Sequence, residues 1–123
     1  IWMSKEELKE YHIESLSNLG EPKALIVDLK IENSGFEPQS LYLYNYLMES
    51  NYYSNALNLD LFIALNPEES MTVMLDVGER KELKLPYVIY EKQFTERQWK
   101  DIENVQGNII VELYPQKKSL EYN

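Results

Sequence analysis

The 123-residue chain has 44% hydrophobic and 27% charged residues, a length and composition typical of one globular domain with a packed core and unlike those of a disordered chain. Acidic residues outnumber basic ones by 21 to 12, and the resulting net charge of −9 excludes nucleic acid as an expected partner. The chain has no cysteine and no apolar run near the ~20 residues of a transmembrane helix, which excludes disulfides, thiolate metal sites and a spanning segment.

The first residues predict a helical turn followed by strands. Ser4 and Glu7 stand at capping-box spacing, which favours a short helical turn through Leu8. Residues Tyr11–Leu16 are a candidate first strand. The clearest strand is Ala24–Glu32, in which hydrophobic and polar residues alternate with the period of two of a half-buried strand.

The middle of the chain predicts two further strands after a turn at Asn33–Gly35. In Leu41–Met48 three leucines lie on one face of the expected strand, and tyrosines and a methionine lie on the other. In Leu57–Leu65 every second residue is leucine or isoleucine. Both segments therefore predict strands.

The second half predicts three more strands and one helix. Residues Met71–Gly78 alternate, and Leu83–Ile89 alternate around Pro86, which indicates an edge strand or a bulge because proline lacks the N–H donor. A capping box at Thr95 predicts a short helix near residues 95–103. Residues Asn108–Tyr114 then return to a strand pattern, and we expect the tail from residue 116 onward to be frayed.

These patterns predict an all-β fold, in which about seven short strands form a two-sheet antiparallel sandwich with one inserted helix. We expect residues 1–123 to form a single domain. Its shared core is expected to contain Leu25 or the residues on the opposite face of its strand, together with Leu29, Ile31, Leu61, Leu85 and Val111.

Several segments resemble a known family. Residues Val27–Gly35, with Pro38 and Leu41–Tyr44 behind them, resemble the opening of telokin-like, immunoglobulin-like domains, which occur in secreted lipoproteins of Gram-positive bacteria. Residues Gly78–Tyr87, Trp99 and Leu113–Pro115 resemble one uncharacterised lineage of that group. The resemblance implies an immunoglobulin-like sandwich and a membrane-anchored, extracellular lipoprotein, with a signal peptide and a lipid-modified cysteine upstream of Ile1. The resemblance assigns a catalytic role to no residue of this chain.

The densest unusual feature is a group of five tyrosines within twelve positions, which forms a candidate binding surface because tyrosine is common at interfaces. The alternative is that these rings are strand-forming residues with a structural role. A surface patch would bind an unidentified protein or a cell-envelope glycan, or support a weak homodimer. The candidate residues are Tyr42, Tyr44, Tyr46, Tyr52 and Tyr53.

No catalytic, metal-binding or cofactor motif is recognisable, and we expect none of these sites. The single histidine, His12, stands in no known motif. The strand patterns place Asp28, Asp60 and Asp76 opposite apolar faces, as on the solvated side of a strand, although a carboxylate pair could serve glycoside hydrolysis. Two hypotheses follow: a non-enzymatic cell-surface binding or accessory domain and, as the alternative, a small carboxylate-dependent hydrolase of cell-envelope glycans. We expect Trp99 to fill the core.

Overall fold

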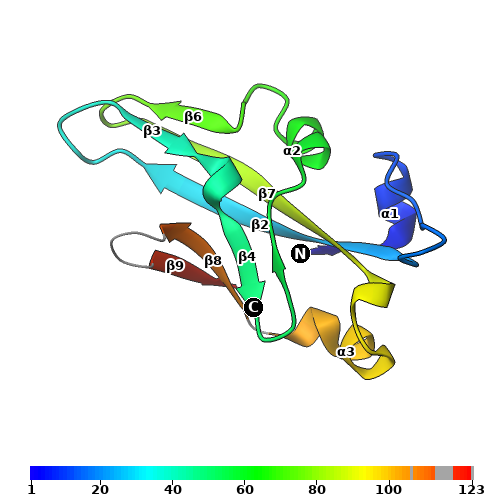
Figure 1. The fold of residues 1–123 in the computed structure, drawn as a ribbon. Coiled ribbons are helices and arrows are strands. Elements are labelled where there is room, and N and C mark those ends of the chain that lie inside the picture. The colour runs from blue at the N-terminus through cyan, green and yellow to red at the C-terminus, as the bar shows by residue number, and fades with distance from the viewer. Residues whose placement is uncertain (106, 113–117, 123) are drawn as a thin grey trace.

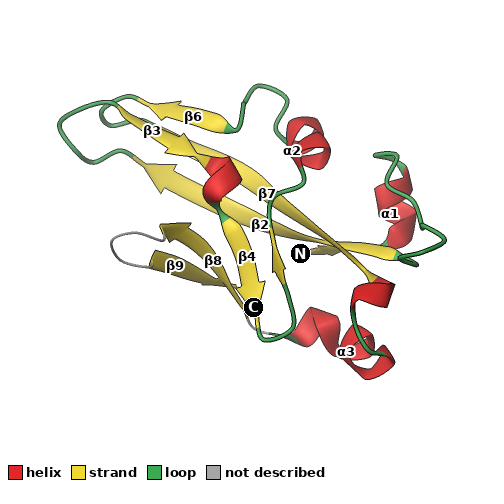
Figure 2. Cartoon of the chain, viewed as in Figure 1, coloured by secondary structure: helices red, strands yellow, loops and turns green. Residues whose placement is uncertain are grey.

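The fold is mostly antiparallel β structure with a few short helices (Figures 1 and 2). The structure, a computed structural model, describes residues 1–105, 107–112 and 118–122. Within these residues the strands form three small sheets, with orders β1-β2-β7, β3-β6 and β5-β4-β8-β9. The prediction of an all-β, antiparallel fold is therefore confirmed at the level of class, although the described strands do not divide into the two sheets of a seven-stranded sandwich.

The longest pairing joins β2 (Pro22–Glu32) to β7 (Arg80–Tyr90), with Pro22 opposite Tyr90 and Glu32 opposite Arg80. The short strand β1 (Trp2–Met3) pairs with β2 at Leu25 and Ala24. The predicted strand over Ala24–Glu32 is confirmed, and so is the edge position of the strand containing Pro86, since β7 is the last strand of its sheet.

The other strands are short and lie across one face of the β2–β7 pair (Figure 1). Strand β3 pairs with β6, and β4 pairs with β5 on one side and with β8 on the other. Strand β8 in turn pairs with β9 through a register shift. Their bounds are β3 Gln39–Tyr42, β4 Leu47–Ser50, β5 Ser54–Asn55, β6 Thr72–Leu75, β8 Gly107–Glu112 and β9 Lys118–Tyr122.

The main hydrophobic core lies between the β2–β7 pair and these short strands. Leu25 and Leu29 of β2 and Leu85 of β7 are buried in it, as predicted, and Ile31 packs against it partly buried. The side chain of Val111 lies outside the described part of the structure. Other buried members of this core are Leu43, Met48, Phe62, Val73, Leu83, Tyr87, Ile89, Ile102 and Ile109.

A second, smaller core covers the opposite face of β2 near its beginning. Ala24 and Ile26 pack there against Leu8 of α1 (Lys5–Lys9) and Leu61 of α2 (Leu59–Leu65). The hydrophobic half of β2 is thus covered on both faces, whereas its charged half, from Asp28 onward, is covered on one face only.

The short helices begin where the sequence supplies caps. The predicted capping boxes of Ser4 with Glu7 and of Thr95 with Gln98 are both present, at the starts of α1 and α3 (Glu96–Asp101). The predicted helix near 95–103 is therefore confirmed, and it continues as the 3-10 helix η3 (Ile102–Asn104). Another 3-10 helix, η2 (Glu91–Gln93), links β7 to this region.

The predicted strand over Leu57–Leu65 is wrong, because residues Leu59–Leu65 form helix α2. Asn58 caps the helix by accepting a hydrogen bond from Leu61 N. Asn66 ends it: its amide group donates to the backbone carbonyls of Phe62 and Lys84 and accepts from Lys84 N. Leucine and phenylalanine side chains on two sides of the helix reach both cores, so alternation along the sequence did not identify a strand.

Three other expectations also need correction. No strand forms over Tyr11–Leu16, where only Leu16 makes an isolated bridge, to Gly20. The expected strand Leu41–Met48 is interrupted by the 3-10 helix η1 (Leu43–Asn45). The tail that we expected to be frayed contains β9, while residues 113–117, including the end of the predicted strand Asn108–Tyr114, lie outside the described residues.

Candidate functional site

The five candidate tyrosines do not form one common surface. Tyr42 and Tyr52 are exposed, at 48% and 41%, whereas Tyr46 and Tyr53 are each only 8% exposed and belong to the main core. The side chain of Tyr44 lies outside the described part of the structure. The expected alternation of leucines inward and tyrosines outward therefore fails at Tyr46, which points inward.

The 3-10 turn η1 explains why Tyr46 points inward. Backbone hydrogen bonds from Leu43 N to Met71 O and from Tyr46 N to Leu43 O fix this turn, which breaks the period of two. The Tyr87 hydroxyl, fully buried, then donates to the Tyr46 backbone carbonyl at 2.8 Å. Burial raises the pKa values of both tyrosines. Tyr46 is thus a structural part of the core that also borders the cleft described next.

A cleft of about 600 Å³ lies beside the second half of β2. Its apolar lining comes from Leu29 and Ile31 of β2, Leu41 of β3, Tyr46, and Leu75 of β6. Its polar rim consists of Lys30, Glu32, Asn33, Ser34, Gly35 and Gln39. The cleft exposes more apolar than polar surface and has its polar groups at the rim, which is the usual character of a ligand-binding site.

Asn33 holds the end of this cleft in place. Its side-chain amide donates to the backbone carbonyls of Glu37 and Leu75, and its oxygen accepts a hydrogen bond from Gly35 N. Its own backbone N–H donates to Glu79 O, so the loop after β2 is attached both to β6 and to the turn before β7. The predicted turn at Asn33–Gly35 is present, but its position at a cleft was missed, because nothing in the local sequence shows that β3 comes to lie opposite β2.

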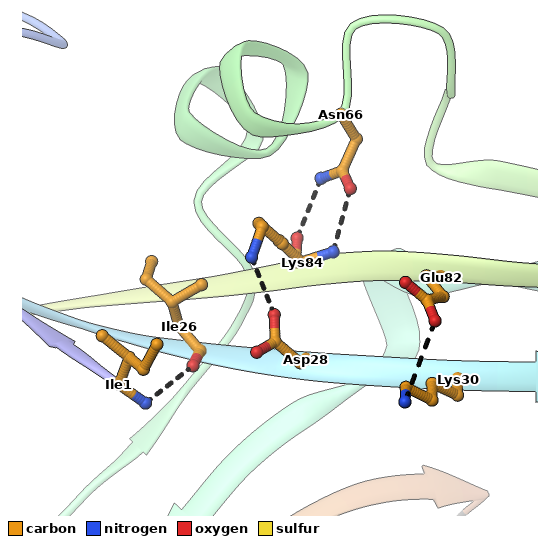
Figure 3. A network of polar contacts seen from close by, with 7 residues as sticks. All are labelled: Ile1, Ile26, Asp28, Lys30, Asn66, Glu82 and Lys84. Carbon is orange, nitrogen blue, oxygen red and sulfur yellow. Dashed lines mark hydrogen bonds and ion pairs between the residues drawn. The ribbon is translucent and has the colours of Figure 1, made fainter.

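The outward face of the β2–β7 pair carries three cross-strand ion pairs, and Figure 3 shows those of Lys84 with Asp28 and of Lys30 with Glu82. Lys84 Nζ lies 2.9 Å from Asp28 Oδ1, Lys30 Nζ lies 3.8 Å from Glu82 Oε1, and Arg80 Nε lies 3.3 Å from Glu32 Oε2. The hydrogen bond from Lys84 holds the pKa of Asp28 below its ordinary value.

A small pocket on this face brings Asp28 and Glu82 together beside Asn66, in a volume of about 320 Å³. Each of the two carboxylates is paired with a lysine. Glycoside hydrolysis requires one carboxylic acid that stays protonated, and this calls for a raised pKa. The pKa of Asp28 is lowered, so Asp28 does not meet this requirement for a protonated acid.

A more polar pocket of about 690 Å³ lies at α3. It is lined by Tyr52, Thr95, Arg97, Gln98, Lys100 and Asp101. An exposed tyrosine ring among amide, guanidinium and hydroxyl groups can contact a polar ligand such as a glycan both by stacking and by hydrogen bonding.

The aromatic cluster beside α3 is structural. Phe94 lies edge-on to Tyr53, with ring centroids 5.9 Å apart, and is stacked on Trp99 at 6.0 Å. The Nζ atom of Lys23 lies 4.8 Å from the centre of the Trp99 ring. Trp99 packs against the main core partly buried, which agrees with the role expected for it.

The remaining polar candidates occupy separate positions. His12 is exposed in the loop after α1 and has a positive φ of 63°, and Asp60 and Asp76 are exposed on α2 and after β6. In the described part of the chain, no three histidine or acidic side chains gather as metal ligands. None of the described helices is long and apolar enough to cross a membrane.

Comparison with known families identifies one match. The model of a domain of unknown function, DUF5028, matches residues 2–118, and the chain therefore belongs to this family. Neither the curated proteins nor the solved structures contain a significant match to the chain.

Proposed function

We propose that this member of the DUF5028 family is a non-enzymatic binding or accessory domain, and that its partner binds in the cleft between β2 and β3. The observation that carries this proposal is the cleft itself, whose volume of about 600 Å³ is within the usual range of ligand sites. Leu29, Ile31 and Leu41 offer apolar surface to a partner, and Asn33 ties its loop by hydrogen bonds to Leu75 of β6 and to Glu79 in the turn before β7. A partner would therefore meet a largely preformed site.

A protein partner fits this cleft better than a glycan, because its lining is mainly apolar. The polar pocket at α3 is the place where a glycan would bind, and there Tyr52 would supply the stacking surface. The alternative of a carboxylate-dependent hydrolase depends on Asp28 and Glu82, and the lysine partners of both residues count against it.

The resemblance to telokin-like domains extends the proposal to an immunoglobulin-like domain of a secreted, membrane-anchored lipoprotein at the cell surface. The gene sequence ahead of the codon for Ile1 tests this placement. We expect it to encode a signal peptide and a lipid-attachment cysteine, followed by a flexible stretch. A reading frame that starts a few codons before Ile1, without an apolar segment, would contradict the surface location.

Photo-crosslinking in the producing cells tests the binding function. A photoreactive phenylalanine analogue replaces Gln39 at the rim of the cleft, Tyr52 at the α3 pocket, or Asp60 on α2 as the matched control. We expect a defined protein adduct at Gln39 and none at Asp60. Absence of an adduct at both Gln39 and Tyr52, together with release of sugars from purified cell-envelope glycan, would favour the hydrolase instead.

A further inference from the structure

In the described part of the chain, one edge of β2 is unpaired beyond Ile26, and the hydrogen bonds of Ile26 and Asn33 show which backbone groups point there. Ile26 N donates to Ile1 O. The Ile1 amino group donates back to Ile26 O (Figure 3), so Ile26 faces the β1 edge. Asn33 N donates to Glu79 O, so Asn33 faces the β7 side. Since alternate residues of an antiparallel strand face alternate edges, the even-numbered residues of β2 face outward.

The outward residues beyond Ile26 are Asp28, Lys30 and Glu32. Strand β1 reaches only Leu25 and Ala24 by register, and in the described part of the chain no other strand pairs with this edge of β2. Each outward residue therefore presents one backbone N–H donor and one C=O acceptor along the edge. Such a row of groups is the template to which an added strand binds.

The cleft lies along this edge. Successive side chains of a strand point to opposite faces, so four consecutive residues, 29 to 32, can line one cavity only where it lies along the edge of the strand. The inner edge is occupied by β7. A strand added to the outer edge would thus direct alternate side chains into the cleft, beside Leu29, Ile31 and Leu41.

The other side chains of an added strand would lie on the charged face, opposite Asp28, Lys30 and Glu32. Strand β7 already shows which charges complement these three positions from the other side, since it places Lys84, Glu82 and Arg80 opposite them. We propose that the outer edge of β2 binds an extended segment of a partner protein in which the order is basic, apolar, acidic, apolar, basic. This order is the same in both directions, so it suits parallel and antiparallel addition.

A second copy of the chain fits this edge less well. If two β2 edges pair antiparallel about Lys30, the two lysines oppose each other, and each Asp28 opposes Glu32 of the other copy, so all three positions carry like charges. In a register centred on Leu29, Asp28 of each copy opposes Lys30 of the other. This gives two complementary charge pairs, whereas the proposed segment gives three. The net charge of −9 on each copy adds repulsion, whereas it attracts a segment with two basic residues.

The inference rests on the proposed function, and its test uses a synthetic peptide with blocked ends, Gly-Thr-Arg-Val-Glu-Val-Lys-Thr-Gly. Amide hydrogen exchange of the ¹⁵N-labelled chain is measured with and without this peptide. In the free chain the amides of Leu29 and Ile31, which face β7, should exchange slowly, and those of Asp28, Lys30 and Glu32 quickly. Bound peptide should slow the even-numbered amides and leave the odd-numbered ones unchanged.

A charge-reversed peptide with glutamate, lysine and glutamate at the three polar positions is the first control, and we expect about tenfold weaker binding. The variant Lys30→Glu/Glu82→Lys keeps the internal ion pair but reverses the central charge of the edge. It should weaken binding of the original peptide and gain affinity for a peptide with lysine at its centre. The variant Glu96→Lys/Lys100→Glu exchanges an ion pair on α3 and should have no effect.

Equal binding of both peptides, or slowed exchange at odd and even positions alike, would overturn the proposal. A concentration-dependent dimer in sedimentation that protects the same even-numbered amides without peptide would assign the edge to a second copy and also overturn it. The binding function is judged separately: adducts at Gln39 with no peptide binding would leave that function standing and remove only strand addition.

Discussion

Replacing Tyr87 by phenylalanine tests how the main core is held together. The Tyr87 ring is fully buried, and its hydroxyl donates to the Tyr46 carbonyl at 2.8 Å, at the residue where η1 leads into β4. Tyr87→Phe keeps the ring and removes this donor, which leaves a buried carbonyl without its partner. We expect the free energy of unfolding at pH 7 to fall by about 1–3 kcal/mol.

The same variant carries a pH signature. Burial raises the pKa of Tyr87 above that of the unfolded chain, because the fold favours the neutral hydroxyl. The stabilisation of the fold by the neutral Tyr87 hydroxyl is fully present below about pH 10, the pKa of tyrosine in the unfolded chain. It is lost as the pH rises toward the pKa of Tyr87 in the folded chain. The difference in stability between the wild type and Tyr87→Phe should therefore shrink above pH 10.

Urea unfolding followed by circular dichroism, at pH 7 and in steps to pH 11, measures both effects. Tyr52→Phe is the matched control, since this ring is exposed and its loss of a hydroxyl should change the stability by less than about 0.5 kcal/mol. If Tyr87→Phe were as stable as wild type at pH 7, the hydrogen bond to Tyr46 would contribute nothing. A difference that grew above pH 10 would refute the electrostatic reasoning.

Three further predictions concern the edge of β2, two glycines with positive φ and the main hydrophobic core. Ile31→Pro should cost about 1–3 kcal/mol more in urea unfolding than Lys30→Pro, because of these two residues only Ile31 donates its N–H to β7; a larger loss for Lys30→Pro would mean that the edge assignment is inverted. Gly20→Ala should be more destabilising than Gly78→Ala in thermal unfolding, since both have positive φ but only at Gly20 would the new Cβ lie 2.7 Å from a glutamate oxygen. Phe62→Ala should lower the free energy of unfolding by about 3–5 kcal/mol, as expected for a fully buried ring, and a loss below 1 kcal/mol would contradict its place in the core.

The elements predicted correctly are those whose signals are local. The alternation in β2 and the capping boxes of α1 and α3 depend on neighbouring residues only, and both survived in the fold. The strand prediction for Leu59–Leu65 failed because Leu61 and Phe62 serve different cores while Leu59 and Ile63 are exposed, so hydrophobic residues lie on the buried and on the solvent side of the helix alike. The caps, Asn58 and Asn66, were the local signal that could have identified the helix.

The candidate site depended on contacts that are distant in sequence. Whether Tyr46 points inward is decided by η1, which is tied to Met71, and by the hydroxyl of Tyr87, 41 residues away. The cleft similarly requires β3 to lie opposite β2, a placement that the pairing of β3 with β6 brings about. Tyrosine density alone therefore could not show which of these rings reach the surface.

The charges of β2 explain both its fixed register and its selective edge. Moving β7 by two residues in either direction would place Asp28 opposite Glu82, or Lys30 opposite Lys84, so like charges oppose a two-residue slip, which is the smallest slip that keeps the hydrophobic face inward. Exposed charges on an edge strand also hinder unselective pairing with other chains. The side chains of Asp28, Lys30 and Glu32 project from the face of the sheet. Their charges can therefore interact with side chains of β7 on one side and with those of an added strand on the other. The residues that select β7 within the fold would thus apply the same selection to any strand added from outside.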